Sequence, residues 1–263
     1  MRIRVEHIDD AEDPRLADYR DLRGVGPDTF VLEGRLLVQK VLASRFRLRS
    51  ILMTRAAFAD LEAALARHGG DVCVYLAAAD TIQRLVGFTF HRGCLAVAER
   101  GDPLALDDLL PDRRLLVVLE HVTNPDNVGG VFRNAAAFGA DGVVLSPGCG
   151  DPLYRKAARV AMGGSLEVPF VHAPDWRAAL ARLKSAGFTL VALTPDVRAV
   201  ELDDLRVPER VALVLGTESD GITPDTRATA DVQATIGMVP GADSLNVATA
   251  CGFALHRLRA RRG

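Results

Sequence analysis

Short runs of apolar residues, each about the length of one strand, recur through the second half of the chain and constrain its fold most strongly. They lie in the segments LLVVLEHV, GVVLSP, TLVALTP, VALVLG and VQATIGMV. Because strands covered on both faces are almost continuously apolar, these runs predict a parallel sheet flanked by helices. Apolar residues at helical spacing predict those helices over residues 128–138, 154–162, 176–186 and 244–259. The predicted fold class is therefore α/β.

The first hundred residues show the same alternation of strands and helices on a smaller scale. We predict a helix near residues 14–22, strands in RLRSILMTR and DVCVYLA, helices over 60–68 and 79–86, and an alternating strand in GCLAVAE. This rhythm indicates a small α/β domain over residues 1–100. The segment 101–114, which contains prolines and aspartates, is typical of a linker, so residues 115–263 form the second predicted domain.

The composition excludes several classes of protein. A net charge of −2 argues against a protein that coats nucleic acid through bulk charge, although a local basic patch is compatible with it. The four cysteines are widely spaced and form no C-x-x-C pair, so we expect neither a zinc site nor a redox dithiol, and no metal. The N-terminal stretch has no apolar signal segment and the apolar runs are too short to span a membrane, so we expect a cytoplasmic protein without a membrane partner.

The first of three polar loops, residues 121–140, follows the first predicted buried strand of the second domain. Its Asn-Pro-Asp-Asn turn precedes a glycine-rich helix start, which Asn127 can cap. Arg133 follows six residues later, so we expect both side chains to face the carboxyl edge of the sheet, where ligands collect in parallel α/β folds. A capped helix with a solvated arginine is the competing interpretation.

The other two loops also adjoin predicted strands. In VALVLGTESDGIT, Gly216 allows the backbone to approach a ligand closely, and Glu218 lies at the edge of the sheet. In IGMVPGADSLNVA, Ser244 is expected to cap an apolar helix, with Asn246 beside it at the helix N-terminus, which favours electron-rich partners. Ordinary loop and capping roles are the alternatives. Neither a phosphate-binding Gly-Lys-Ser/Thr loop nor a dinucleotide-binding G-x-G-x-x-G follows the first strand.

Together the segments NPDNVGGVFRNAAAFGA, LGTESDGIT and IGMVPGADSLNVA resemble, in order and spacing, the three motifs of the SpoU/TrmH family of RNA 2′-O-ribose methyltransferases, of the SPOUT class. The segments FVLEGRLLVQKVL and GCLAVAE are similar to the ribosomal-protein-L30e-like substrate-binding domain of that family. The chain departs from the third motif at Gly237, where the family usually has proline, and at Ala248, where it usually has serine.

The resemblance implies a SPOUT α/β domain whose parallel sheet contains a deep trefoil knot, preceded by a smaller L30e-like α/β domain that binds RNA. It also implies S-adenosylmethionine as the cofactor, without a metal, and a homodimer formed through the knot domain. The reaction would be methylation of a ribose 2′-hydroxyl in RNA, and the extra N-terminal domain favours ribosomal RNA over transfer RNA.

The resemblance also assigns individual residues to the site. The residues that match the catalytic positions of the family are Asn127, Arg133, Glu218, Ser244 and Asn246. The residues that match its cofactor-binding positions, or lie beside them, are Leu193, Thr194, Gly216, Ile236, Met238 and Leu245. Arg133 would bind a phosphate beside the reacting ribose and stabilise its developing alkoxide.

RNA contacts have a separate signal in the first domain. Arg45, Arg47 and Arg49 alternate along SRFRLRS, so they share one face if this segment is extended. Each guanidinium suits a phosphate, and together with Arg133 they are the predicted RNA-binding residues. Solvated surface arginines are the competing interpretation.

Two other functions are compatible with parts of the sequence. A non-catalytic RNA-binding protein on the same fold is the main alternative, although the full set of predicted catalytic residues speaks against it. A nucleotide-binding α/β enzyme such as a dehydrogenase is the second, and the missing dinucleotide fingerprint speaks against it.

Overall fold

The computed structural model describes residues 3–20, 22, 28–87, 90, 92–196, 198–217, 219–239 and 244–259. Its contacts divide the chain into two compact units. The first comprises Met1–Asp102 with Leu153–Leu166, and the second comprises Pro103–Pro152 with Glu167–Gly263.

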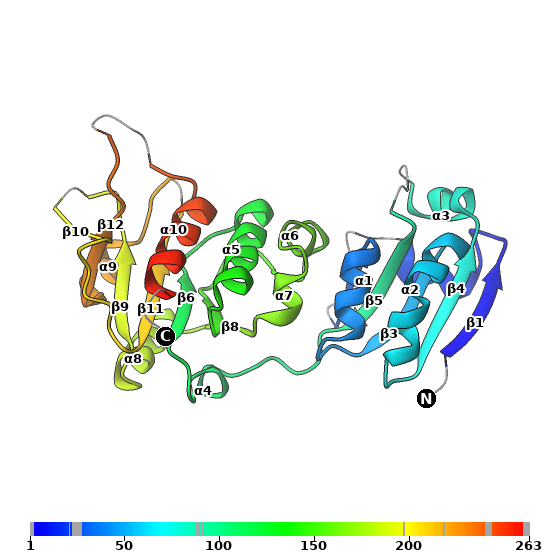
Figure 1. The fold of residues 1–263 in the computed structure, drawn as a ribbon, viewed down its shortest axis with the longest axis horizontal. Coiled ribbons are helices and arrows are strands. Elements are labelled where there is room, and N and C mark those ends of the chain that lie inside the picture. The colour runs from blue at the N-terminus through cyan, green and yellow to red at the C-terminus, as the bar shows by residue number, and fades with distance from the viewer. Residues whose placement is uncertain are drawn as a thin grey trace. The chain divides into compact units, whose positions relative to one another are not determined.

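The first unit is built around a five-stranded mixed sheet (Figure 1). The strand order is β1-β4-β3-β5-β2, so β1 and β2 form the two edges of the sheet. Strand β5 is antiparallel to both of its neighbours, β3 and β2. The strands are β1 (Ile3–Ile8), β2 (Thr29–Glu33), β3 (Leu48–Met53), β4 (Val72–Ala77) and β5 (Cys94–Glu99). The helices are the 3-10 helix η1 (Pro14–Tyr19), α1 (Arg35–Leu42), α2 (Arg55–Arg67), α3 (Ala79–Val86) and α6 (Arg155–Val160).

Two sequence predictions for the first unit need correction. Helix α2 begins at Arg55 rather than at residue 60, because Thr54 Oγ1 accepts a hydrogen bond from Ala57 N and caps it there. Strand β5 is buried at every position from Cys94 to Ala98 instead of alternating, because it lies between β3 and β2. The prediction of α3 over residues 79–86 is confirmed.

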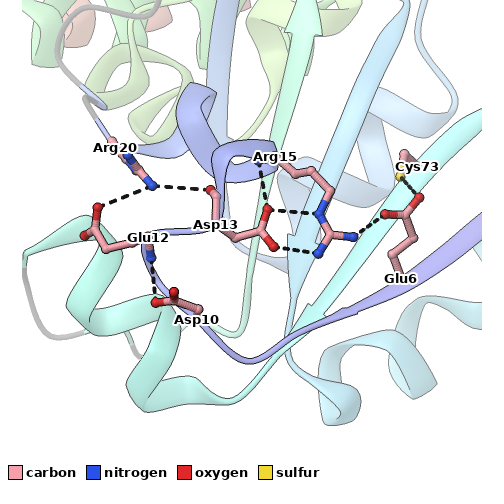
Figure 2. A network of polar contacts seen from close by, with 7 residues as sticks. All are labelled: Glu6, Asp10, Glu12, Asp13, Arg15, Arg20 and Cys73. Atoms are coloured by element: carbon pink, nitrogen blue, oxygen red, sulfur yellow. Dashed lines mark hydrogen bonds and ion pairs between the residues drawn. The ribbon is translucent and has the colours of Figure 1, made fainter.

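Arg15 connects β1 to the start of η1 (Figure 2). Its guanidinium donates to Glu6 Oε2 at 2.7 Å and, through Nε and Nη2, to both carboxylate oxygens of Asp13. Asp13 also caps η1 by accepting from Arg15 N at 2.9 Å. The side-chain and backbone hydrogen bonds from Arg15 lower the pKa of Asp13 to about 2. The interactions therefore favour the charged form of this carboxyl.

This pairing predicts a measurable change in titration. A carboxyl whose pKa is lowered by folding contributes stability above its unfolded pKa, and loses that contribution as the pH falls through its folded pKa. For Asp13 the window lies between its ordinary pKa of 3.8 and its lowered pKa of about 2. In an Arg15→Gln variant we expect the Asp13 pKa, measured by carboxyl ¹³C NMR, to rise towards 3.8. A value that stays near 2 would contradict this account.

The second unit contains a seven-stranded sheet in which every pair of neighbours is parallel, which confirms the predicted fold class. The order is β10-β12-β9-β11-β6-β7-β8 (Figure 1). The strands are β6 (Leu115–Leu119), β7 (Gly142–Leu145), β8 (Phe170–His172), β9 (Thr189–Leu193), β10 (Val200–Glu201), β11 (Val211–Leu215) and β12 (Val232–Thr235). The helices are α4 (Leu106–Leu109), α5 (Pro125–Phe138), α8 (Trp176–Ser185), α9 (Pro224–Thr229) and α10 (Val247–Arg259), and α7 (Gly164–Glu167) spans the boundary between the units.

Burial explains why the sequence pattern predicted this sheet. Strands β6, β7 and β11 are buried at every position, because helices cover both faces. On one face Leu116 and Val118 pack in a cluster with Leu180 and Leu183 of α8. Leu109, within the segment predicted as a linker, joins this cluster through the short helix α4. In the described part of the chain, no helix combines the length and the apolar character that crossing a membrane requires.

Candidate active site

A cavity of about 260 Å³ lies where strands β9, β11 and β12 end. Because these strands are parallel neighbours, their carboxyl ends meet at one edge of the sheet, the usual position of ligand sites in such folds. All six residues predicted to bind a cofactor line this cavity, together with Ser244: Leu193, Thr194, Gly216, Ile236, Met238 and Leu245. The volume is near the lower end, roughly 300 Å³, of small-molecule sites.

The loop after β11 folds back so tightly that only glycine fits at position 216. Thr217 and Gly221 exchange two backbone hydrogen bonds of 3.1 Å, and Gly221 has a φ of 67°. A Cβ on Gly216 would lie 2.0 Å from Gly221 O and 2.4 Å from Ile222 N. The absence of a side chain therefore lets this turn close beside the cavity. Glu218, the predicted catalytic residue of this loop, lies outside the described residues.

Asn127 and Asn246 meet, although 119 residues separate them in the sequence. Asn246 Nδ2 donates a hydrogen bond of 2.8 Å to Asn127 Oδ1 and so connects the first turn of α5 to the start of α10. Asn246 Oδ1 accepts from Ala248 N and Thr249 N, so Asn246 caps α10 and the predicted cap, Ser244, does not. The cap of α5 is likewise Asn124, which accepts from Asp126 N, and not Asn127. Asn127 therefore contacts Asn246 instead of capping α5, and Ser244 lines the cavity instead of capping α10.

Helices α5 and α10 pack closely because small residues face each other. A Cβ on Gly130 would lie 2.6 Å from the Cβ of Ala248, and Asn134 Nδ2 donates to Ala248 O at 2.6 Å. Asn134 follows Asn127 by seven residues, or two helical turns, so both amides lie on the face of α5 that meets α10. A small residue at 248 therefore suits this contact.

Arg133 lies on a different face of α5. Six residues of α-helix rotate a side chain by about 600°, or 240° net, at roughly 100° per residue, so Arg133 does not share the face of Asn127. Its side chain is exposed and has no hydrogen-bond or ion-pair partner among the described residues. The structure thus joins Asn127 to Asn246, and it presents Arg133 to solvent.

Glu120, at the end of β6, was not singled out in the sequence, yet it organises this edge of the sheet. It is only 1% exposed. Its carboxylate accepts hydrogen bonds from Trp176 Nε1 at 2.9 Å, from Thr223 N at 2.8 Å, and from the hydroxyls of Thr223 and Thr226. Glu120 therefore anchors α8, α9 and the chain after the Gly216–Gly221 turn. The sequence did contain a signal for Glu120, since it is a charged residue that directly follows the apolar strand LLVVL.

Removing Glu120 should destabilise the second unit strongly. In a Glu120→Ala variant, buried donors of Trp176 and Thr223 lose an acceptor, so we expect the free energy of unfolding to fall by roughly 3 kcal/mol. Urea denaturation followed by tryptophan fluorescence measures this change. The control is Glu209→Ala, at an exposed position, for which we expect a change within about 0.5 kcal/mol. Equal stability of the two variants would contradict the role of Glu120.

Three of the four arginines predicted to bind RNA lie around the start of β3, and the fourth is Arg133 on α5. Exposed and buried residues alternate from 45 to 50, so Arg45, Arg47 and Arg49 are all exposed. Arg47 forms an ion pair with Glu99 at 3.3 Å and Arg49 forms one with Asp18 at 3.3 Å. Surface pairs of this kind contribute little to stability, so they leave these guanidinium groups able to exchange partners.

Among the described residues, no group of three or more histidine, cysteine or acidic side chains is arranged to hold a metal ion. Cys94 and Cys251 are fully buried, and burial raises the pKa of the Cys94 thiol to about 12 and that of Cys251 further still. These two thiols therefore stay protonated and unreactive at neutral pH.

The comparisons with known proteins agree with this geometry. The sequence matches the model of the SpoU rRNA Methylase family over residues 114–256, more than half of the 263-residue chain. The chain belongs to this family. The match begins at the residue before β6 and extends into α10, and so it contains the cavity, the Gly216 loop and the Asn127–Asn246 pair.

Several curated proteins resemble this SpoU family member over most of its length. It is 40% identical to an uncharacterized tRNA/rRNA methyltransferase of Mycobacterium tuberculosis, over 98% of this chain and 93% of the relative. It is 34% identical to the 23S rRNA (guanosine-2′-O-)-methyltransferase RlmB of Acinetobacter baylyi, over 70% of this chain and 77% of the relative.

Solved structures of other methyltransferases share the fold. The AdoMet-bound rRNA methyltransferase from Sinorhizobium meliloti superposes with a TM-score of 0.84 at 23% identity, covering 98% of this chain and 99% of the other. The SpoU methyltransferase AviRb from Streptomyces viridochromogenes, in complex with AdoMet, has a TM-score of 0.80 at 22% identity, covering 95% and 99%. These likenesses show that this chain shares its fold with the two methyltransferases over at least 95% of its length.

Proposed function

We propose that this protein transfers a methyl group from S-adenosylmethionine (AdoMet) to a ribose 2′-hydroxyl of RNA, with ribosomal RNA favoured over transfer RNA. The observation that carries the proposal is that three loops far apart in the sequence meet at one edge of the sheet. There the hydrogen bond between Asn127 and Asn246 joins helix α5 to helix α10. Curated relatives named as 23S rRNA guanosine-2′-O-methyltransferases and as a tRNA/rRNA methyltransferase support the reaction and the substrate class.

The cavity residues fit AdoMet. Apolar side chains such as Leu193, Ile236 and Leu245 suit the flat faces of an adenine ring. The turn at Gly216 leaves no room for a Cβ, which brings its backbone close to the cavity. Arg227, which also lines the cavity, has a buried Nε without a hydrogen-bond partner, so the lining contains a donor that a ligand can satisfy. No metal is required for this chemistry.

The cofactor, when bound, supplies a methyl group on a positively charged sulfur. The reaction would release the proton of the ribose 2′-hydroxyl to solvent, form the O–CH₃ bond and break the S–CH₃ bond, which would leave S-adenosylhomocysteine. The protein must therefore orient the ribose in line with that bond and stabilise the developing negative charge. A guanidinium is normally charged at neutral pH, so Arg133 acts by holding a neighbouring phosphate and stabilising the alkoxide. Asn127 and Asn246 orient the loops, with Glu218 and Ser244 assigned to the same site.

RNA recognition is assigned to the first unit. Its exposed Arg45, Arg47 and Arg49 offer phosphate contacts, and a domain of the L30e-like type would position the RNA for the second unit. Substituting all three with glutamine should weaken RNA binding and reduce its salt dependence, whereas AdoMet affinity should not change. Unchanged RNA affinity in this variant would sink the assignment.

Dimerisation, the knot and cytoplasmic location belong to the same proposal. Phe253 on α10 is 58% exposed, which supports a partner surface on that helix. A Phe253→Asp variant should sediment as a monomer where the parent protein sediments as a dimer, and a monomeric parent protein would refute the dimer. In the sheet β11 lies between β9 and β6, and β12 between β10 and β9, an order that is compatible with a trefoil knot. An experimental trace of the chain from Thr235 to Val247 tests it.

The function is tested by incubating the purified protein with methyl-labelled AdoMet and, separately, unmodified 23S ribosomal RNA or transfer RNA. We expect label in ribosomal RNA and little in transfer RNA. Label in transfer RNA alone would overturn the substrate preference. AdoMet and RNA binding without transfer to either RNA or to precursor ribosomal particles would favour the non-catalytic RNA-binding alternative.

A further inference from the structure

Arg227 lines the cavity but belongs to none of the three motif loops. It lies on α9, and it is the one cationic side chain among the described residues that form the cavity wall. Its side chain is partly buried, and its Nε is fully buried without a hydrogen-bond partner. Buried donors in native proteins are nearly always satisfied, and leaving one unpaired destabilises the protein. A ligand that accepts from this guanidinium would remove that destabilisation.

The surroundings of Arg227 explain why the donor is held in place instead of relaxing to solvent. The residue before it, Thr226, is only 2% exposed and donates a hydrogen bond to the buried carboxylate of Glu120. Thr223 caps the helix and donates to the same carboxylate. Helix α9 is therefore fixed at two positions beside Arg227, and the guanidinium is preorganised to bind.

The nearby acidic groups are already engaged by other partners. Asp196, just beyond the end of β9, accepts two side-chain hydrogen bonds from Arg198, at 3.0 and 2.8 Å. Asp220, which lines the cavity, accepts from Ser219 Oγ at 2.7 Å. No ion pair joins Arg227 to either carboxylate in the described part of the chain, although, after the hydrogen bonds from Arg198, the nearby charge of Arg227 helps to lower the pKa of Asp196. The buried Nε of Arg227 therefore keeps a free donor in the cavity wall, which suits an anionic group on the ligand.

We propose that Arg227 binds the carboxylate of the methionine portion of AdoMet. This inference rests on the proposed function. The carboxylate is the only group on the cofactor with a full negative charge, and a guanidinium binds carboxylates through paired donors. Arg227 is therefore a binding residue that fixes the amino-acid end of the cofactor, separate from the residues assigned to the ribose.

The test compares two ligands that differ only in this group, AdoMet and decarboxylated AdoMet, by titration calorimetry. For Arg227→Gln we expect AdoMet affinity to fall about 10- to 100-fold, as loss of a charge-assisted hydrogen bond predicts, with affinity for decarboxylated AdoMet unchanged within about twofold. Arg227→Lys should keep part of the AdoMet affinity. The control, Arg177→Gln at an exposed position of α8, should bind both ligands as the parent protein does.

The outcomes separate this inference from the proposed function. If the parent protein binds AdoMet and Arg227→Gln binds it equally well, the carboxylate assignment is wrong and the function stands. An equal loss for both ligands also overturns the assignment, because Arg227 would then act on the shape of the cavity or on the adenosine. If the parent protein binds neither ligand, the proposed function itself fails.

Discussion

Replacing Arg133 with alanine is expected to lower the rate of methyl transfer by about 10²- to 10³-fold, the usual effect of removing one preorganised donor to a developing oxyanion. The same variant should bind AdoMet with unchanged affinity, because Arg133 does not line the cavity. Its free energy of unfolding should change by no more than about 0.5 kcal/mol, since the side chain is exposed and unpaired among the described residues. Single-turnover kinetics with labelled AdoMet measure the chemical step directly.

Two further variants make the Arg133 result specific. Arg133→Lys keeps the charge but not the planar set of donors, so we expect a rate between those of the parent protein and Arg133→Ala. Arg177→Ala, an exposed arginine on α8, should leave the rate unchanged. A parent-like rate for Arg133→Ala would remove Arg133 from the mechanism, and an equal loss in Arg177→Ala would point to general charge instead.

A methyl group at position 216 should have the second large effect. In Gly216→Ala the new Cβ would lie 2.0 Å from Gly221 O, a backbone atom that cannot move without opening the turn. We therefore expect AdoMet affinity to fall by at least about 100-fold, since the turn forms part of the cavity wall. The free energy of unfolding should drop by roughly 1–3 kcal/mol, as for other overpacked sites. Calorimetric titration and thermal unfolding measure the two quantities.

Gly237→Ala is the matched control for this prediction. The three atoms nearest to a Cβ at Gly237 would all belong to the carboxylate of Glu201, the closest at 3.0 Å, and this exposed side chain can move aside. The substitution also reduces the freedom of the unfolded chain, so we expect stability to be equal or slightly higher. If Gly216→Ala binds AdoMet as well as Gly237→Ala does, the tight turn at Gly216 is not required for binding the cofactor.

The sequence predicted those strands that are buried on both faces, because such strands consist almost entirely of apolar residues. The apolar runs of β6, β7, β9 and β11 identified a parallel sheet, because both faces of these strands are covered. Strand β1 was not predicted, since most of its side chains are charged or partly exposed and it is held by backbone pairing with β4. Strands β8 and β10, with three and two residues, are too short to show any period.

The site could be predicted where residues lie in motifs and not where they depend on the order of strands. The resemblance nominated Gly216, Ile236 and Leu245, and the structure places all three in one cavity. The helix caps were assigned to the wrong residues, because the turns before α5 and α10 each contain more than one residue able to cap. Glu120 could have been noticed as a charged residue that ends an apolar strand, but its partners Thr223 and Thr226 lie beside it only because β6 and β11 are neighbours. No local pattern predicts that pairing.

The most direct measurement is the position of the methyl group on the RNA. After incubation with methyl-labelled AdoMet, the labelled RNA would be hydrolysed in alkali, which cleaves only beside a free 2′-hydroxyl. We expect label in an alkali-resistant dinucleotide, and almost none there when Arg133→Ala replaces the parent protein. Label that appears in single nucleotides would place the methyl group on a base and contradict the central claim.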